Sequence, residues 1–451
     1  MRKLIAALVC VALIVGTVSA KPKNDKNVKV INVWSFTDEV PSMVEKFKAT
    51  HPNFGYDINV TIIATTEGAY QPALDQALAG GGKDAPDIYA AEAAFVLKYT
   101  QGDASNYAAK YKDLGINVNK AVKDAAIAQY AVDIGTRGRD LVALPYQATG
   151  GAFIYRRSIA KAVWGSDDPK VVKEKIGGAT GNLDKFWKAA EDLKAKGYKI
   201  CSGDGDLWHA VENSSDKGWI VNNKLYIDPK REAFLDYSKK MFDNGYHNDT
   251  RDWTDAWFAD MKETGTAFGY FGPAWLINYV MANNSGGSKI GEGSYGDWAV
   301  CESPLGFFWG GTYILANNDT KCKDAVRQII EWITLDTSND GLLYQWANAE
   351  FKWAYQKGAD PSKTTKDTVS SGVVMAKSNG KLDFLNGQNM FDVFVPAGEF
   401  ANGKNLTQYD ETINIYWRDQ VREYTAGNKT REQALADFKQ NVADNLDVIV
   451  E

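Results

Sequence analysis

The chain has 451 residues, of which 45% are hydrophobic and 24% charged, and its formal net charge at pH 7 is −6. Single hydrophobic cores stop growing at about 250 to 300 residues, so this length predicts two domains. The negative charge disfavours nucleic acids and anionic membranes as partners, because both are themselves negatively charged.

The first twenty residues have the pattern of a secretory signal peptide. Arg2 and Lys3 precede an apolar stretch that is shorter than the ~20 residues of a membrane span, and a small-residue end at Ala20 follows. We expect cleavage after Ala20 and a soluble, exported protein. Removing the two cations from the 51 basic residues leaves 49 against 57 acidic ones, a net charge of about −8.

Cysteine usage argues against a disulfide framework. Beyond Cys10 there are three cysteines, Cys201, Cys301 and Cys322, so at most one bridge can form. Cys10 itself raises the question of a lipid anchor. Bulky Val9 precedes it, where a lipidation site would need a small residue, and this disfavours anchoring.

Strand-like and helix-like segments alternate in the N-terminal part. The β-branched residues 28–34 predict a strand, and a helix follows with Asp38 as its N-cap and Pro41 in its first turn. The next segments in order are the strand YDINVTII, the helix YQPALDQALA, the strand PDIYAA and the helix AFVLKYT. This order predicts a parallel sheet covered by helices, and hence an α/β fold.

Two later segments predict that the chain crosses from one sheet to another. Residues 140–157 read as two strands joined through Pro145 and a Gly-Gly pair without a helix between them. Residues 297–317 repeat the pattern through Pro304 and a second Gly-Gly pair. Two crossings would create two lobes, a hinge and a cleft. Residues 357–372 are the candidate for a third passage of the chain between the lobes.

The expected division of the chain follows from these crossings. It comprises a signal peptide of residues 1–20, a first lobe of residues 21–147 plus 310–372, and a second lobe of residues 148–309 plus 373–451. The C-terminal part of the second lobe reads as two helices, because Gly427 is typical of a helix end and Thr430 with Gln433 of a capping box.

Signals for catalysis and for metals or cofactors are weak. The three histidines lie far apart without ligand spacing, the segment GGGKD lacks the remainder of a phosphate loop, and no G-x-S-x-G motif occurs. We therefore expect no enzyme activity and no cofactor. Residues 252–260, DWTDAWFAD, leave two interpretations open: a glycosidase acid pair, or an amphipathic helix with Trp253 and Trp257 on one face.

Aromatic residues make up 12% of the chain and include 14 tryptophans, which predicts either bulky cores or flat faces for a ligand. Trp34, Trp187 and Trp332 lie within strand or helix patterns, so we expect them in cores. In the stretch GYFGPAWLINYV, a buried strand ends at Gly272 and a helix begins near Pro273. Trp275 then lies in the first turn, at the carboxyl end of the strand, where it would face a cleft.

Seven stretches in a fixed order, spanning nearly all of the expected mature chain, carry a resemblance to a known family. They are VWSFTDEVPSMVEKFKATHP, DAPDIYAAEAAFVLKY, ALPYQATGGAFIYRRSIA, NLDKFWKAAEDLKAKGY, GTAFGYFGPAWLINYV, FFWGGTYILANNDTKCKDAVRQIIEWI and TREQALADFKQNVAD. The chain resembles the carbohydrate-binding extracellular solute-binding proteins of ABC transporters, the maltose-binding-protein-like group. The resemblance implies a periplasmic-binding-protein fold with two α/β lobes, a periplasmic or extracellular location, a sugar ligand and delivery to a membrane permease. It does not imply catalysis. We expect a monomer.

Candidate ligand-binding residues follow from two rules. In open parallel sheets, ligands bind beyond the carboxyl ends of the strands, and the resemblance adds the aromatic residues of two loops, Trp275 and Trp309. A flat aromatic ring suits the apolar C–H face of a sugar, while polar groups meet its hydroxyls. The candidates are Thr37, Asp38, Glu39, Tyr70, Glu92, Tyr146, Gln147, Trp208, His209, Glu212, Trp253, Trp257, Trp275, Trp309, Gly310 and Gly311.

Two other functions remain open at this point. One is a solute-binding protein for a different cargo, such as a peptide or a polyamine, and a polyamine receptor would need several clustered carboxylates in the cleft. The other is a secreted carbohydrate-active enzyme, which would need a catalytic carboxyl pair.

Overall fold

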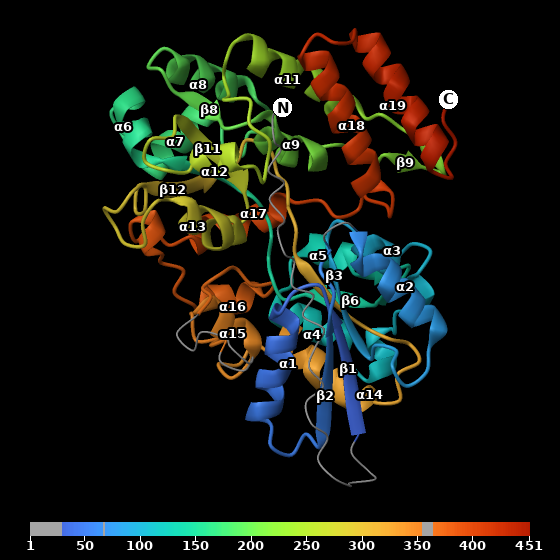
Figure 1. The fold of residues 1–451 in the computed structure, drawn as a ribbon. Helices are drawn as coiled ribbons and strands as arrows, with labels where there is room; N and C mark the ends of the chain where they lie inside the picture. The colour runs from blue at the N-terminus through green and yellow to red at the C-terminus, as the bar shows by residue number, and fades with distance from the viewer. Residues whose placement is uncertain (1–28, 66–67, 354–363) are drawn as a thin grey trace, which may run out of the picture.

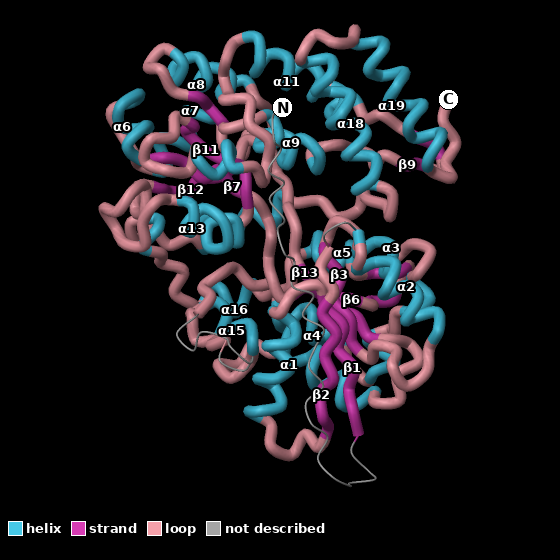
Figure 2. The backbone as a smooth tube through the Cα atoms, in the orientation of Figure 1, coloured by secondary structure: helices cyan, strands magenta, loops and turns pink. Residues whose placement is uncertain are grey.

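The computed structural model describes residues 29–65, 68–353 and 364–451. The expected signal peptide lies outside these residues. Within them the strands form two separate groups that are joined by extended segments (Figure 2). Each group is the centre of one α/β lobe (Figure 1), as the sequence predicts.

The first sheet has five strands in the order β2-β1-β3-β13-β6. Their bounds are β1 (Lys29–Ser35), β2 (Tyr56–Ile62), β3 (Ile88–Glu92), β6 (Ala143–Pro145) and β13 (Thr312–Ala316). The strand β1 pairs in parallel with β2 and β3, which confirms the predicted parallel arrangement. The strand β13 runs antiparallel to β3 and β6, because it enters from the other lobe.

Helices cover both sides of this sheet (Figure 1). The helix α1 (Glu39–Thr50) contacts β1 and β2, and α14 (Lys323–Thr334) packs against α1 and β13. Pro41 lies in the first turn of α1 as predicted. The other helices of this lobe are α2 (Tyr70–Gly80), α3 (Val96–Thr100), α4 (Val118–Ala125), α5 (Gln129–Ile134), α15 (Leu342–Ala347) and α16 (Gly372–Ala376), with short 3-10 turns η2 (Ser105–Tyr107) and η3 (Tyr111–Leu114) and the small hairpin of β4 (Thr136–Arg137) and β5 (Asp140–Leu141).

The second sheet has four strands in the order β12-β7-β11-β8. Their bounds are β7 (Ala152–Arg156), β8 (Lys199–Cys201), β11 (Ala267–Gly272) and β12 (Trp298–Glu302). Every residue of β7 is buried, and alternate side chains enter different clusters. Phe153 and Tyr155 pack in the core of the second lobe, whereas Ala152 and Ile154 pack toward the lobe interface, as the two-residue period of a strand requires.

The helices of the second lobe lie on both faces of this sheet, and α18, α19 and α11 pack together at its outer end (Figure 1). The predicted caps are confirmed: Gly427 has a left-handed φ of 78° after α18, and Thr430 and Gln433 form the capping box of α19. The remaining elements are α6 (Arg157–Trp164), α7 (Pro169–Ile176), α8 (Asp184–Lys194), α9 (Asp204–Asn213), β9 (Ile220–Val221), β10 (Lys224–Leu225), α10 (Pro229–Glu232), α11 (Phe234–Asp243), α12 (Asp255–Ala259), η4 (Leu276–Met281), α13 (Ala282–Asn284), η5 (Asp383–Leu385), α17 (Phe391–Phe400), α18 (Asp410–Thr425) and α19 (Arg431–Asn445).

Both predicted crossings are confirmed, and they run side by side. The chain passes from β6 in the first sheet to β7 in the second, and returns from β12 to β13. The amide of Gly151 donates to the carbonyl of Phe307 at 2.9 Å, and the amide of Trp309 donates to the carbonyl of Thr149 at 3.1 Å. The two passages therefore form a hydrogen-bonded two-stranded ribbon between the lobes, which we call the hinge ribbon (residues 149–151 and 307–309).

The predicted third passage is corrected in its described part. Residues 357–363 lie outside the described residues. Residues 364–372 remain on the first lobe, where the amide of Gly372 donates to the carbonyl of Ala126 at 3.1 Å and α16 packs on α4 and α15. The chain reaches the second sheet only at η5 and α17, and α17 contacts both β12 and α5. The residue boundaries of the lobes stay a prediction.

A substitution at Gly151 in the hinge ribbon tests how tightly the two passages are packed. A Cβ atom at this position would overlap the ring of Phe307. We expect Gly151→Ala to lower the free energy of unfolding by about 1 to 3 kcal/mol, as overpacking does. Urea unfolding followed by circular dichroism measures it.

Gly80 provides the matched control, because a Cβ there would meet nothing within 4 Å and its φ is not left-handed. Gly80→Ala should change stability by less than about 1 kcal/mol, in the stabilising direction. Equal effects of the two substitutions would contradict the close packing of the ribbon.

Candidate functional site

A cavity of about 940 Å³ lies between the two lobes. The first lobe contributes the loop after β1, the end of β3 and residues 364–367, and the second lobe contributes the loop before α12 and the first turns after β11. The wall thus forms at the carboxyl ends of β1 and β3, as expected for an open parallel sheet.

Eleven of the sixteen candidate residues line this cavity. They are Thr37, Asp38, Glu39, Tyr70, Glu92, Gln147, Trp253, Trp275, Trp309, Gly310 and Gly311. Asp38 is at the N-cap position of α1, but its side chain makes no capping hydrogen bond. Tyr70 is fully buried and donates to the carbonyl of Ala90 at 2.7 Å, so it supports the wall more than it projects from it.

Three tryptophans form one wall of the cavity. The indole Nε1 of Trp275 donates to the carbonyl of Trp309 at 2.9 Å, and the two rings meet edge to face with centroids 4.8 Å apart. The ring of Trp253 lies nearly parallel to that of Trp275, with an interplanar angle of 11° and centroids 6.3 Å apart. Together they present flat apolar surface to the cavity.

Trp253 occupies a strained backbone conformation. Its φ is 66°, in the left-handed region that costs a non-glycine residue about 1 to 2 kcal/mol, and its side chain is 48% exposed. The predicted helix with Trp253 and Trp257 on one face is therefore wrong, because α12 begins only at Asp255. The strained turn directs the Trp253 indole toward Trp275 while Trp257 is buried.

The glycine pair before β13 allows the cavity wall to close in. Gly310 has a φ of 72° and Gly311 a φ of 114°. A Cβ atom on Gly310 would lie 3.3 Å from Glu92 Oε1 and 3.3 Å from Trp275 Nε1. Glu92 and Trp275, from different lobes, therefore approach the same point of backbone, and a side chain there would separate them.

Two carboxyl groups in the wall have raised pKa values. Burial raises the pKa of Glu92 to about 7, against the opposing effect of the Ala94 amide, which donates to its Oε2 at 2.7 Å. Burial raises the pKa of Asp367 to about 8, although the amide of Thr368 donates to its Oδ1 at 2.7 Å. Both groups exchange protons near neutral pH and can donate or accept hydrogen bonds there.

The sequence identifies the family to which the chain belongs. The family model of bacterial extracellular solute-binding proteins matches residues 34–340, which is well over half of the chain. The chain belongs to this family. Membership confirms the resemblance drawn from the ordered motifs, and it implies a periplasmic or extracellular location.

Solved structures share the fold over nearly the whole chain. An extracellular solute-binding protein of family 1 is 16% identical, covers 92% of this chain and 99% of its own, and gives a TM-score of 0.73. The sugar-binding protein MalE from the phytopathogen Xanthomonas citri is 14% identical, with 92% and 97% coverage and a TM-score of 0.66. The galacto-N-biose-/lacto-N-biose I-binding protein of the ABC transporter from Bifidobacterium longum, in complex with lacto-N-biose, is 16% identical, with 95% and 100% coverage and a TM-score of 0.64. Comparison with curated protein sequences gives no significant match.

His209 supports this solute-binding protein's cavity from behind and is not part of its wall. Its ring stacks on Trp309 with centroids 3.7 Å apart, and its Nε2 lies 3.3 Å from Asp252 Oδ2. Burial alone would raise the pKa of Asp252, but the hydrogen bond from His209 and the charge of Arg418, 3.2 Å away, bring it well below its usual range. The predicted ligand contact is corrected to a support for Trp309.

Tyr146 and Trp208 are also corrected. Tyr146 is fully buried, and its hydroxyl donates to the carboxylate of Glu39, so it orients a wall residue without reaching the cavity. Trp208 is buried in the core of the second lobe against Phe234. Gln147, the residue that follows Tyr146, does line the cavity.

Glu212 and Trp257 lie inside the second lobe, contrary to prediction. The carboxylate of Glu212 accepts a hydrogen bond from Asn414 Nδ2 at 2.5 Å. Trp257 is 1% exposed, and its Nε1 donates to Asp206 Oδ1 at 3.0 Å. Their polar atoms are already paired within the lobe.

Sequence reasoning missed a large part of the wall. The missed residues are Phe36, Thr65, Gly68, Gln71, Phe95, Asn278, Tyr279, Asn283, Thr312, Trp346, Trp353, Thr364, Thr365, Lys366, Asp367 and Glu411. Trp346 and Trp353 are two of the 14 tryptophans of the chain, but neither follows a predicted strand. The residues around Asp367 follow no strand, so the strand-end rule could not find them.

None of the three carboxylates in the segment DWTDAWFAD, which are Asp252, Asp255 and Asp260, lines the cavity. Asp252 pairs with His209 and Arg418, and Asp260 accepts hydrogen bonds from Ser202 and Asn248. Among the residues that the structure describes, no group of three His, Cys, Asp or Glu side chains could hold a metal ion. The cysteines Cys201, Cys301 and Cys322 are free thiols.

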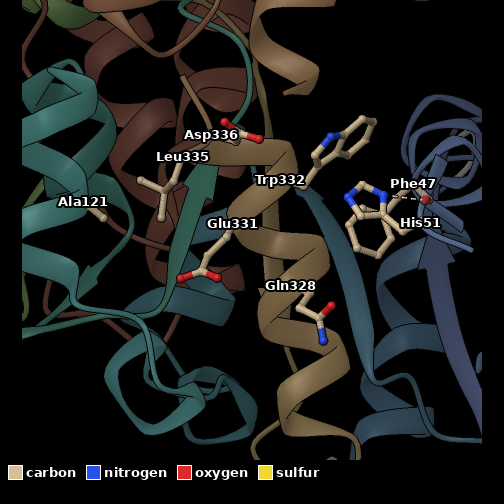
Figure 3. A pocket seen from close by; sticks show the side chains of 8 residues that line it. All are labelled: Phe47, His51, Ala121, Gln328, Glu331, Trp332, Leu335 and Asp336. Atoms are coloured by element: carbon tan, nitrogen blue, oxygen red, sulfur yellow. Dashed lines mark hydrogen bonds between the residues drawn. The ribbon is translucent and has the colours of Figure 1, made fainter. Parts of the chain in front are cut away.

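A second hollow lies on the outer side of the first lobe, between α1 and α14 (Figure 3). There the His51 ring stacks on Phe47 with centroids 4.0 Å apart, and Trp332 meets His51 edge-on. It shares no lining residue with the cavity between the lobes.

No described helix is long and apolar enough to cross a membrane.

The raised pKa values predict how stability depends on pH. Glu92 and Asp367 ionise near 4.5 and 3.8 in an unfolded chain but near 7 and 8 in the folded protein, so between pH 5 and 8 the folded state binds more protons. The stability they contribute is therefore fully present in acid and is lost as pH rises through this window, by on the order of 1 to 3 kcal/mol. Urea unfolding of the unliganded protein at several pH values measures it.

Glu92→Gln should reduce this pH dependence, because it removes one of the two titrating groups. Glu191→Gln, on the exposed face of α8, should leave the dependence unchanged. Stability that rises from pH 5 to pH 8, or an unchanged slope in Glu92→Gln, would contradict the raised pKa of Glu92.

The strain at Trp253 predicts a difference between two truncations. Trp253→Gly and Trp253→Ala remove the same indole, but only glycine adopts a φ of 66° without a steric cost. We expect the glycine variant to be more stable than the alanine variant by about 1 kcal/mol. In an ordinary strand or helix the order is the reverse, so an alanine variant of higher thermal stability would show that the turn is not strained.

Proposed function

We propose that the mature protein is the extracytoplasmic binding component of a carbohydrate ABC importer. The observation that carries the proposal is the wall of the cavity, in which Trp253, Trp275 and Trp309 stand beside carboxylate and amide side chains. A sugar has apolar C–H faces and a rim of hydroxyls, so it needs flat aromatic surface together with polar groups at the edge.

The relatives support the same class of cargo. The Bifidobacterium longum protein is in complex with lacto-N-biose and belongs to an ABC transporter, and the Xanthomonas citri protein is described as sugar-binding. Delivery to membrane permease subunits follows by analogy with that transporter. The cavity of about 940 Å³ is near the upper end of the usual range of about 300 to 1,000 Å³, which favours an oligosaccharide over a single ring.

The hinge ribbon supports binding by closure of the lobes. Gln147 and Thr312 flank the ribbon on the first-lobe side, and the Gln147 side chain accepts a hydrogen bond from the amide of Thr312 at 3.3 Å. A ligand that touches both lobes stabilises the closed arrangement by its differential contacts. We further propose that the N-terminal signal peptide exports the chain, that cleavage follows Ala20, and that the mature protein acts as a monomer.

The structure does not support the alternative that the protein is a carbohydrate-active enzyme. That alternative depended on carboxylates in the segment DWTDAWFAD, and Asp252 and Asp260 are both engaged in hydrogen bonds outside the cavity. We therefore propose binding without turnover. Incubation with oligosaccharides should give saturable stabilisation and no product.

Thermal unfolding with a panel of mono- and oligosaccharides tests the sugar cargo. We expect at least one sugar to raise the melting temperature in a concentration-dependent way. Trp275→Ala should lower the affinity for that sugar by about 30-fold, which is the effect of losing roughly 2 kcal/mol at a central aromatic contact. Titration calorimetry measures the change in affinity.

Trp187→Ala is the matched control, because Trp187 is also half-buried but lies on α8 far from the cavity. It should bind the sugar normally. Trp275→Phe, which keeps a ring, should retain most of the binding if the fold tolerates the change. The absence of stabilisation across the panel, or normal binding by Trp275→Ala, would refute the proposed function.

A further inference from the structure

Among the described residues that line the cavity, acidic side chains outnumber basic ones. The carboxylates are Asp38, Glu39, Glu92, Asp367 and Glu411, and the one cation of this described set is Lys366. The ammonium of Lys366 already donates to the carbonyl of Lys381 at 3.2 Å, on the exposed side of the segment. An excess of negative charge in a partly closed cavity favours a cationic ligand.

Two acids of the wall, Glu92 and Asp367, are influenced by the charges of further acids. Besides burial, which is the main cause, Glu411 and Glu212 raise the pKa of Glu92 by their negative charges. Glu39 does the same to the pKa of Asp367. Each of these two acids is therefore ionised at a cost that a bound cation would offset.

Glu92 is the best placed of these acids for a ligand. Its Oε2 accepts the hydrogen bond from the Ala94 amide, whereas its Oε1 points toward Gly310. A Cβ on Gly310 would be 3.3 Å from that oxygen and 3.4 Å from Cζ2 of Trp275. A carboxylate oxygen and the edge of an indole thus meet at one place, beside the parallel face of Trp253.

A carboxylate beside aromatic rings is a favourable site for an ammonium group. The carboxylate and the ammonium group form a charge-assisted hydrogen bond, which is about twice as strong as a hydrogen bond between neutral groups. A hydroxyl group gains only a hydrogen bond with an ionised acceptor. The site therefore discriminates between an amine and a hydroxyl at the same position of a ligand.

The indole N–H of Trp346 indicates that the ligand also carries hydrogen-bond acceptors. Trp346 lines the cavity and is 1% exposed, and its Nε1 has no hydrogen-bond partner among the described residues. The indole N–H can only donate, and a buried donor without a partner costs about 1 to 3 kcal/mol. A hydroxyl or ring oxygen of a ligand would satisfy it, and a simple diamine would not.

We propose that the cargo is an amino sugar, an oligosaccharide with at least one free amine, whose ammonium group binds at Glu92 beside Trp275. This inference depends on the proposed carbohydrate-binding function and names the class of sugar. The tryptophans bind the ring faces, Trp346 donates to a ring or hydroxyl oxygen, and Glu92 with Glu411 receives the ammonium group.

Titration calorimetry at pH 7 with three matched disaccharides tests the proposal. The probes are the β-1,4-linked glucosamine dimer, its N,N′-diacetylated form and the β-1,4-linked glucose dimer, with the three corresponding monosaccharides and galactosamine beside them. We expect a free-amine sugar to bind at least ten times more tightly than its acetylated and hydroxyl counterparts. Putrescine serves as the cation without a sugar ring and should bind much more weakly.

Glu92→Gln separates the charge from the shape of the site. It should lower the affinity for the amino sugar at least tenfold and so remove the preference for the amine. Glu191→Gln, an exposed acid on α8, should keep the preference. Raising the salt concentration should weaken binding of the amino sugar more than binding of the hydroxyl sugar, because the ammonium contact is electrostatic.

Several outcomes would overturn the proposal, and they differ from failure of the proposed function. If a neutral or acetylated sugar binds as tightly as its amine counterpart, the amino-sugar inference is wrong and the carbohydrate receptor stands. A preference that survives in Glu92→Gln also refutes the assignment of the ammonium to that residue. If putrescine binds and no sugar in the wider panel does, both the inference and the proposed function fail.

Discussion

The pairing of the two crossing strands is the constraint on which the binding site depends. Hydrogen bonds from Gly151 to Phe307 and from Trp309 to Thr149 hold the passages in register. That register sets where the glycine pair emerges, and hence how closely Glu92 of the first lobe approaches Trp275 of the second. The cavity is therefore not simply the gap between two independent lobes, because its central wall is built from the connection that joins them.

The binding site contains groups that each lower the stability of the folded protein. Trp253 is held at a left-handed φ, and Glu92 and Asp367 are carboxyls whose ionised forms are disfavoured. Natural proteins tolerate such features mainly where function requires them, and here they are gathered at one cavity. The rest of the molecule offsets them with two well-packed cores.

Much of the fold could be predicted from local patterns. The β-branched runs, the Gly-Gly pairs and the Thr430 capping box each act within a few residues, so their signal survives in the sequence. The first-lobe wall was also accessible, because strand ends in a parallel sheet meet at one edge. Trp275 was placed correctly by the turn at Pro273, where the strand stops and a helix starts.

What could not be predicted depends on contacts between distant segments. Nothing near Trp346 indicates that its indole faces a cavity lined by the other lobe, and nothing near His209 indicates that it stacks behind Trp309. The segment DWTDAWFAD shows the opposite error. Its spacing fits a helix that includes Trp253, but the backbone turns at Trp253 and α12 begins only at Asp255. The rings of Trp253 and Trp257 still lie close together, with centroids 5.9 Å apart.

The helix α18 joins the beginning and the end of the chain at the site. Glu411 lies in the cavity wall, and Arg418, two turns further along, pairs with the Asp252 carboxylate that holds His209 behind Trp309. The wall that starts at Phe36 is thus complete only when the residues of α18 are in place. A chain that emerges from its N-terminus during export would acquire its binding site among its last steps of folding, after nearly all of it has crossed the membrane.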